Sequence, residues 1–184
     1  MTRTATAAVT FDAVLRRPAQ PKNAAWAFLV LPQAASTKLP TRSQVTVEGT
    51  LASAPFQATL EPDGAGSHWR KVDKALLDAA NVRPGDTVTL EIAPVAKEPE
   101  PKLPPDLRAA LSANPATKST WDDITAVARR DGIQWVTSGK KAETRVKRIA
   151  TACDELASGQ RRACCFDRSG MYSRGNLGAP AAAD

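Results

Sequence analysis

His68 is the residue whose chemistry is most conspicuous, because it is the only histidine in a chain of 184 residues. An imidazole titrates near neutral pH and is the side chain best suited to general acid or base work. A Ser-His-Asp or Cys-His arrangement would have to use His68, yet no nucleophile-elbow motif accompanies it, and the three cysteines lie in the other half of the chain. No catalytic residue is predicted, and we expect a protein that is not an enzyme.

Ligand contact is the other chemical use for His68. It follows the glycine turn at residues 64–66 and precedes Trp69, a place from which it would line the mouth of a barrel. Trp26 would add apolar contact, and Arg42 would hold an anion. The candidate ligand-binding residues are therefore Trp26, Arg42, His68 and Trp69. The competing interpretation is structural, since a lone histidine and a tryptophan in a strand belong more often to a core.

Metal binding is not predicted, because His68 with Cys164 and Cys165 has no usual ligand spacing. No cofactor is predicted either.

The densest charge lies in KKAETRVKRIATACDELASGQRR, residues 140–162, with seven Lys or Arg against three Asp or Glu. Arginine grips phosphate in a bidentate way, so this segment is a candidate site for a polyanion or a partner. Its candidate contact residues are Lys140, Lys141, Arg145 and Arg148. The alternative is the solvated side of a packed helix. The stripe that would pack consists of Val146, Ile149, Ala150, Cys153, Leu156 and Ala157.

The features that usually accompany nucleic-acid binding are missing from this segment. No aromatic side chain is interleaved with the basic ones, so a stacking platform for single strands is missing. Neither a helix-turn-helix turn nor zinc-finger spacing is recognisable.

Composition places the chain among soluble globular proteins, with 42% hydrophobic and 24% charged residues and a net charge of +6. No apolar run is long enough to cross a bilayer, and the N-terminus lacks the apolar region of a secretion signal. An odd cysteine count without CxxC spacing argues against a disulfide framework. We expect a cytoplasmic protein without membrane insertion, whose oligomeric state the sequence leaves open.

The first half of the chain alternates apolar and polar residues with the period of strands. Strands are expected around residues 9–15, 24–31, 45–51, 56–60, 67–72 and 88–92. Ala52–Ser53 would form a hairpin turn, and Asp73 would cap one short helix. Six short strands in about ninety residues predict a closed or nearly closed β-barrel over residues 5–95.

The second half is expected to be helical. Residues 96–104 are rich in proline and predict an extended linker. Three helices should fill residues 105–160: Pro105 starts the first, Thr125 caps the second and Gly159 closes the third. Residues 161–184 are predicted to be a disordered tail.

Two segments, KLPPDLRAALSANPA at 102–116 and KKAETRVKRI at 140–149, together resemble the bacteriocin-protection, or YdeI/OmpD-associated, family. The family's K-x-x-E-T-R-x-x-R-I signature is represented by Lys140, Glu143, Thr144, Arg145, Arg148 and Ile149. Ala142 stands where proline is usual. The first half resembles the small barrel domain of unknown function that often precedes this helical part, so the resemblance covers roughly residues 9–162.

The resemblance implies an α+β fold with a six-stranded double-split β-barrel, similar to the AbrB/MazE-type DNA-binding barrels, one short helix and a small C-terminal three-helix region. It also implies links to envelope stress and antimicrobial-peptide resistance in some relatives. No catalytic residues come with it.

We predict a non-enzymatic bacterial protein that binds an unknown protein or a small anionic partner. Its expected role is in the stress response or in resistance to antimicrobial peptides or bacteriocins. One alternative is a DNA-binding regulator of the AbrB/MazE type, which would use the Lys and Arg residues at positions 3, 16, 17, 22, 38 and 42. A second alternative is a small-molecule-binding or catalytic barrel that uses His68 and Arg42.

Overall fold

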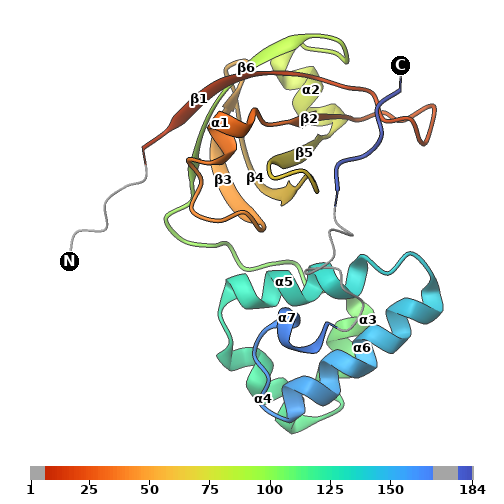
Figure 1. Cartoon of the computed structure of the whole chain (residues 1–184). Coiled ribbons are helices and arrows are strands. Elements are labelled where there is room, and N and C mark those ends of the chain that lie inside the picture. Colours follow the sequence, from red (N-terminus) through yellow and green to blue (C-terminus); the bar gives the residue numbers. More distant parts are fainter. Residues whose placement is uncertain (1–6, 168–177, 184) are drawn as a thin grey trace. The chain divides into compact units, whose positions relative to one another are not determined.

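The computed structural model describes residues 7–167 and 178–183, and these residues form two compact units (Figure 1). Unit 1 holds the strands, up to residue 96, together with residues 178–183. Unit 2 begins at residue 97 and is helical. The predicted α+β class is confirmed.

Unit 1 is an antiparallel sheet that curls into a half-barrel (Figure 1). Its strands are β1 (Val9–Val14), β2 (Ala27–Val30), β3 (Val45–Leu51), β4 (Ala54–Pro62), β5 (His68–Val72) and β6 (Thr87–Pro94). The spatial order is β1-β6-β3-β4-β5-β2. An antiparallel bridge between Arg16 and Phe28 connects the chain just after β1 to β2, so the two ends of the strand order are linked. The six expected strands are confirmed, and the expected closed or nearly closed barrel is a half-barrel.

Alternating burial shows why these segments are strands. In β6, Val88, Leu90 and Ile92 are buried, whereas the residues between them are exposed. The same period places aliphatic side chains of the other strands in one core inside the curl. Gly49 lies where β3 approaches β6, and a Cβ added there would be 1.9 Å from the carbonyl oxygen of Glu91. Only glycine allows the two backbones to come this close.

The β3–β4 hairpin turns at Ala52 and Ser53, as predicted. Both residues have positive φ, 45° and 73°, as a two-residue turn of the primed type requires. This conformation is unfavourable for residues that carry a Cβ.

Two short helices accompany the sheet. Helix α2 (Lys74–Ala80) begins where expected, with the Asp73 carboxylate accepting a hydrogen bond from the Leu76 amide at 2.9 Å. Helix α1 (Gln33–Ser36) was not expected; it follows Pro32, which is tolerated at a helix start.

Unit 2 contains the three expected helices and two more within the described residues. Its helices are α3 (Pro105–Ser112), α4 (Pro115–Asp123), α5 (Ala126–Thr137), α6 (Ala142–Ala157) and α7 (Ala163–Phe166). Their core is formed by Leu107, Leu111, Trp121, Ile124 and Leu156.

Helix α4 was not expected, although Asn114-Pro115 carries a signal for its start. The dipeptide ends α3 and also begins α4: the Asn114 side chain accepts a hydrogen bond from the Ala116 amide at 2.9 Å, and Pro115 occupies the first turn. The caps at Thr125 and Gly159 lie where the sequence predicts them.

Two stretches are more ordered than the sequence suggests. Within the expected linker, Glu98 forms an ion pair with Arg130 at 2.8 Å, and Glu100 forms one with Arg129 at 2.7 Å, so both residues are fixed to α5. Within the expected disordered tail, residues 163–166 form α7, and Ala182 is bridged to Pro18 in unit 1. Residues 168–177 of that tail lie outside the described residues.

None of the helices in the described part of the chain has both the length and the apolar character needed to span a bilayer.

Candidate functional site

The family signature on α6 makes its first contact with α3. The Arg145 guanidinium donates to both carboxylate oxygens of Asp106, at 2.6 and 3.0 Å. These hydrogen bonds hold the pKa of Asp106 at about 2 and raise the pKa of Arg145. The two segments that carry the resemblance are thus joined by a bidentate ion pair.

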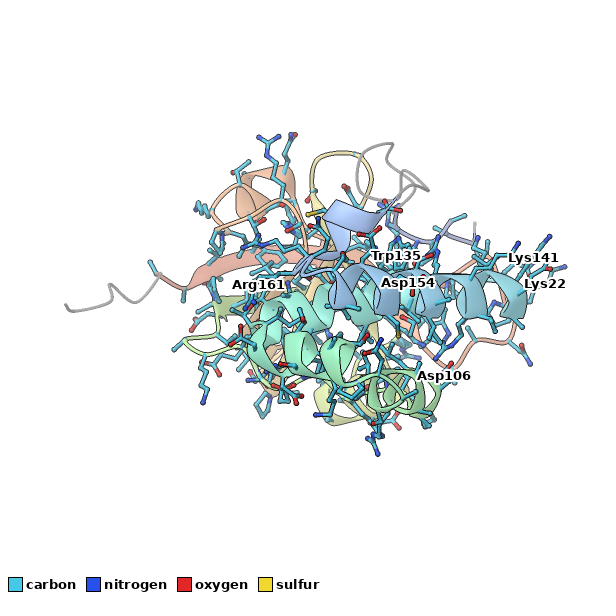
Figure 2. The ribbon with its side chains drawn as sticks, turned by 90° about the horizontal axis from the view of Figure 1, so that it is seen from below. Lys22, Asp106, Trp135, Lys141, Asp154 and Arg161 are labelled. Carbon is cyan, nitrogen blue, oxygen red and sulfur yellow. The ribbon has the colours of Figure 1, made fainter. Side chains whose placement is uncertain are left out.

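The second signature arginine closes the end of α5. Arg148 donates to the Trp135 carbonyl at 2.5 Å and to the Ser138 hydroxyl at 2.7 Å. Its guanidinium also lies 5.2 Å from the centre of the Trp135 ring, within cation–π range. The indole N–H of Trp135 donates to Asp167 at 2.8 Å. Figure 2 shows Trp135 of α5, Asp106 of α3 and Asp154 of α6, with Lys141 just before the start of α6. A positive group at a helix C-terminus satisfies the last carbonyls and complements the helix dipole.

The packed face of α6 is therefore rotated from the expected one. Ile149 and Cys153 pack against the core, and Leu156 is buried, as predicted. Val146, however, is 66% exposed, and Ala150 and Ala157 are exposed as well. The expectation that Arg145 and Arg148 face solvent or a partner has to be corrected, because both are half-buried and hydrogen-bonded within unit 2.

The other two predicted polyanion contacts, Lys140 and Lys141, are exposed at the start of α6. The four residues thus divide into two that hold helices together and two that face solvent.

His68 is fully buried and both of its ring nitrogens are hydrogen-bonded. Nε2 lies 2.9 Å from the carbonyl oxygen of Ser43, and Nδ1 lies 2.6 Å from the hydroxyl of Ser36. Because a carbonyl only accepts, Nε2 carries the proton and Nδ1 accepts from the Ser36 hydroxyl. Ser36 is itself 5% exposed, so a substrate cannot reach the pair. The arrangement ties α1, β5 and the segment before β3 together.

The remaining predicted ligand contacts do not gather around a cavity with His68. Trp26 is half-buried, with the Lys71 ammonium 4.7 Å from its ring centre. Trp69 is half-buried and packs edge-on against Phe28, with ring centres 6.3 Å apart. Arg42 is exposed.

A cleft of about 440 Å³ lies elsewhere in unit 1, along the segment that follows β1. It is lined by Val14, Leu15, Arg16, Arg17, Pro84, Gly85, Ala182 and Ala183.

Backbone hydrogen bonds hold the segments that border the cleft in place. Leu15 exchanges hydrogen bonds with the turn before β6, since its amide donates to the Asp86 carbonyl and its carbonyl accepts from the Gly85 amide. Two residues further on, the Arg17 carbonyl accepts from the Ala183 amide at 2.8 Å. Along one edge of this segment, Leu15 therefore pairs with the turn before β6 and Arg17 pairs with the C-terminal segment, and residues of both partners line the cleft.

The arginines at this cleft differ from those of α6 in having no internal partner. Arg16 and Arg17 are exposed, and within residues 7–167 and 178–183 neither side chain makes a hydrogen bond or an ion pair. The carboxylate of nearby Asp86 accepts from the Arg83 amide at 2.9 Å and is thereby already engaged. Guanidinium groups in this state are available to carboxylate or phosphate groups of a partner.

Metal and thiol chemistry find little support in the described part of the chain. No three His, Cys, Asp or Glu side chains are grouped there in a way that would hold a metal ion. Burial raises the pKa of the Cys153 thiol, which keeps it protonated near neutral pH.

Sequence comparison identifies both halves of the chain. Residues 100–159 match the family described as bacteriocin-protection, YdeI or OmpD-associated, and residues 11–92 match the domain of unknown function DUF1905. The predicted resemblance is confirmed: the helical half of the chain matches the bacteriocin-protection, YdeI or OmpD-associated family, and the first half matches the DUF1905 domain. No curated protein matches the chain.

The cleft was not predicted as a site. Arg16 and Arg17 were predicted only as scattered cations of the DNA-binding alternative. The one available signal was two adjacent arginines directly after a strand. Their neighbours at residues 182–183 are distant in sequence and lie in a segment of alanines that carries no recognisable pattern.

Proposed function

We propose that this protein is a non-enzymatic, cytoplasmic binding protein whose unit 1 cleft takes a partner bearing negative charge. In keeping with its family, it would act in bacteriocin protection or a related stress response. The observation that carries this proposal is the contrast between its arginines. Arg145 and Arg148 are engaged inside unit 2, whereas Arg16 and Arg17 line an open cleft without a described partner.

The size and chemistry of the cleft support this proposal. About 440 Å³ falls within the range of pockets that hold small ligands or the anchoring side chains of a partner. Val14, which is 44% exposed, offers apolar contact beside the two cations. A net charge of +6 attracts anions from a distance and speeds their encounter with the protein.

A non-catalytic role is supported by the geometry at His68. The only histidine is buried, and both ring nitrogens are satisfied by groups of the fold. A barrel that catalyses with His68 and Arg42 would require an imidazole that substrate can reach.

Titration with inorganic pyrophosphate, followed through the backbone amide NMR signals of the full chain, tests the proposal. We expect saturable shifts at Arg16, Arg17 and Gly85, which disappear in the double variant Arg16→Gln/Arg17→Gln. The matched control Lys140→Gln/Lys141→Gln removes the same charge from α6 and should leave the shifts intact. Shifts that gather at Lys140 and Lys141, or that survive in the first variant, would refute the proposal.

Duplex DNA is the second probe in this experiment and addresses the regulator alternative. Binding to duplex DNA weakens steeply with added salt, in proportion to the number of phosphates contacted. Salt-sensitive binding of DNA by the wild type, spread over many cations and unaffected by Arg16→Gln/Arg17→Gln, would favour the AbrB/MazE-like alternative over the cleft.

A further inference from the structure

The segment after β1 behaves as a strand with two pairing edges. Arg16 exchanges both backbone hydrogen bonds with Phe28, at 2.7 and 2.9 Å, on one side. On the other side the Arg17 carbonyl accepts from Ala183, and the Ala19 amide donates to Ala181, each at 2.8 Å. Successive residues of an extended chain offer their backbone groups to opposite sides. Residues 179–183 therefore occupy a strand edge of unit 1.

The segment that occupies this edge is held mainly by its backbone. Its sequence, Ala-Pro-Ala-Ala-Ala, offers almost no side-chain area to bury, and Ala181 and Ala183 are exposed. The pairing is short, because a single bridge, Pro18 to Ala182, joins the segment to the edge and only the two hydrogen bonds at Arg17 and Ala19 flank it. One further hydrogen bond, from the Ala179 amide to the Asp63 carbonyl at 3.2 Å, holds the start of the segment. Only these few hydrogen bonds offset the conformational entropy that residues 179–183 lose when they are ordered. We therefore expect the segment to leave the edge readily.

The edge is continuous with the cleft. Ala182 and Ala183 form one wall of the cleft, opposite the turn at Pro84 and Gly85, and Arg16 and Arg17 line it between them. A peptide that replaced residues 179–183 would gain the same backbone bonds. Acidic side chains on such a peptide would also reach Arg16 and Arg17, which the alanines of the resident segment cannot engage.

We propose that the Arg17–Ala19 edge is a docking site for an extended, acidic peptide segment of a partner protein, and that residues 179–183 occupy it in the resting protein. Docking adds a strand to the sheet, so backbone bonds supply affinity and the neighbouring arginines supply selectivity. The preference for acidic side chains rests on the proposed function, whereas strand addition stands independently of it.

Two synthetic peptides and a full-chain variant test this inference. The peptides are residues 178–184, GAPAAAD, and the same peptide with Ala181→Glu and Ala182→Glu, each carrying a fluorescent label. In the protein, Ala183→Pro removes the amide that donates to Arg17, and Ala183→Gly, which keeps that amide, is the matched control. Thermal unfolding verifies that both variants fold, as expected for an exposed residue remote from the core.

We expect the acidic peptide to bind Ala183→Pro about fivefold more tightly than the wild type, since losing one backbone hydrogen bond of the competing segment changes an equilibrium by about that factor. Ala183→Gly should bind like the wild type. If neither peptide binds Ala183→Pro better than the wild type, the docking edge is refuted.

The triple variant Arg16→Gln/Arg17→Gln/Ala183→Pro separates this inference from the proposed function. We expect it to bind the two peptides equally, at the affinity that GAPAAAD has for Ala183→Pro. If the acidic peptide keeps its advantage in the triple variant, the docking edge stands but the anion preference of the cleft, and with it the proposed function, fails.

Discussion

At the scale of single residues, the position of a polar group relative to its partner decides whether it serves the fold or is available for binding. Arg145, Arg148 and His68 all attract attention in the sequence as chemical groups. Each of the three side chains is hydrogen-bonded to other groups of its own unit. The side chains of Arg16 and Arg17 make no hydrogen bond or ion pair with the described residues.

The His68 contacts predict a stability effect for Ser36. Replacing Ser36 with alanine leaves Nδ1 of a fully buried imidazole without a donor, which should lower the free energy of unfolding by about 1–3 kcal/mol. Urea denaturation measures the change. The control Thr37→Ala alters the next hydroxyl, which is exposed, and should stay within about 0.5 kcal/mol of the wild type. Unchanged stability of Ser36→Ala would contradict a structural role for the pair.

The Asp106–Arg145 pair predicts a dependence of stability on pH. The pKa of Asp106 is about 2 in the folded protein, below its ordinary value of 3.8, so the pair stabilises the fold fully above pH 3.8 and loses its effect as pH falls through 2. Thermal unfolding at a series of pH values should show a higher midpoint for the wild type than for Asp106→Asn above pH 3.8. The gap should close by about pH 2.

The charge-matched control for this experiment is Asp154→Asn, at an exposed site on α6. Its difference from the wild type should not follow the same pH course. A gap between wild type and Asp106→Asn that stays constant down to pH 2 would show that the ion pair does not form in solution.

At the scale of elements, the β3–β4 hairpin stores strain that a single substitution should relieve. Ser53 is exposed and adopts φ 73°, a conformation that glycine reaches without a steric penalty. Ser53→Gly should raise the free energy of unfolding by about 0.5–1 kcal/mol, because relief of the left-handed penalty outweighs the extra entropy that glycine loses on folding. Ser53→Ala keeps the Cβ and should bring no gain, so equal stability of the two variants would argue against the primed turn.

Two glycines predict opposite effects for the same change. In Gly49→Ala the new methyl group collides with the backbone of β6, and the free energy of unfolding should fall by at least about 2 kcal/mol. In Gly132→Ala, inside α5, the methyl group would lie 3.6 Å from the Trp121 ring, an ordinary contact, and alanine favours helix by up to about 1 kcal/mol. Chemical denaturation of both variants should therefore give shifts of opposite sign.

The elements show where sequence reasoning succeeds and where it fails. Strand periodicity and helix caps are local, so the six strands and the caps at Asp73 and Thr125 were predictable. The face of α6 was not, because the packed face includes Arg145 and Arg148 and leaves Val146 exposed. The rule that arginine faces water selects the wrong stripe when Asp106 and the end of α5 offer partners.

The candidate site escaped prediction for a related reason. The cleft is formed by the end of β1, the turn before β6 and residues 182–183, and their proximity comes from strand pairing across the length of the chain. The alanine-rich sequence contains no local pattern that predicts its pairing with Arg17 and Ala19. Long-range pairing of this kind depends on the fold and cannot be read from spacing.

At the scale of the whole molecule, the chain passes from unit 1 into unit 2 and returns to unit 1 at its end. The family signature lies in unit 2, where two of its arginines stabilise the helical fold. The cleft lies in unit 1, in the DUF1905 region, and its arginines have no partner among the residues that the structure describes. The signature arginines and the proposed binding site therefore lie in different units, each of which matches a family model of its own.

The side-chain guanidinium N–H signals of arginine, recorded by NMR on the full chain with and without inorganic pyrophosphate, test this division of roles most directly. We predict that the Arg145 and Arg148 signals are protected from solvent exchange and stay in place when pyrophosphate is added, whereas those of Arg16 and Arg17 exchange rapidly and shift. Signals of Arg145 and Arg148 that move with pyrophosphate, while Arg16 and Arg17 remain unchanged, would contradict the account.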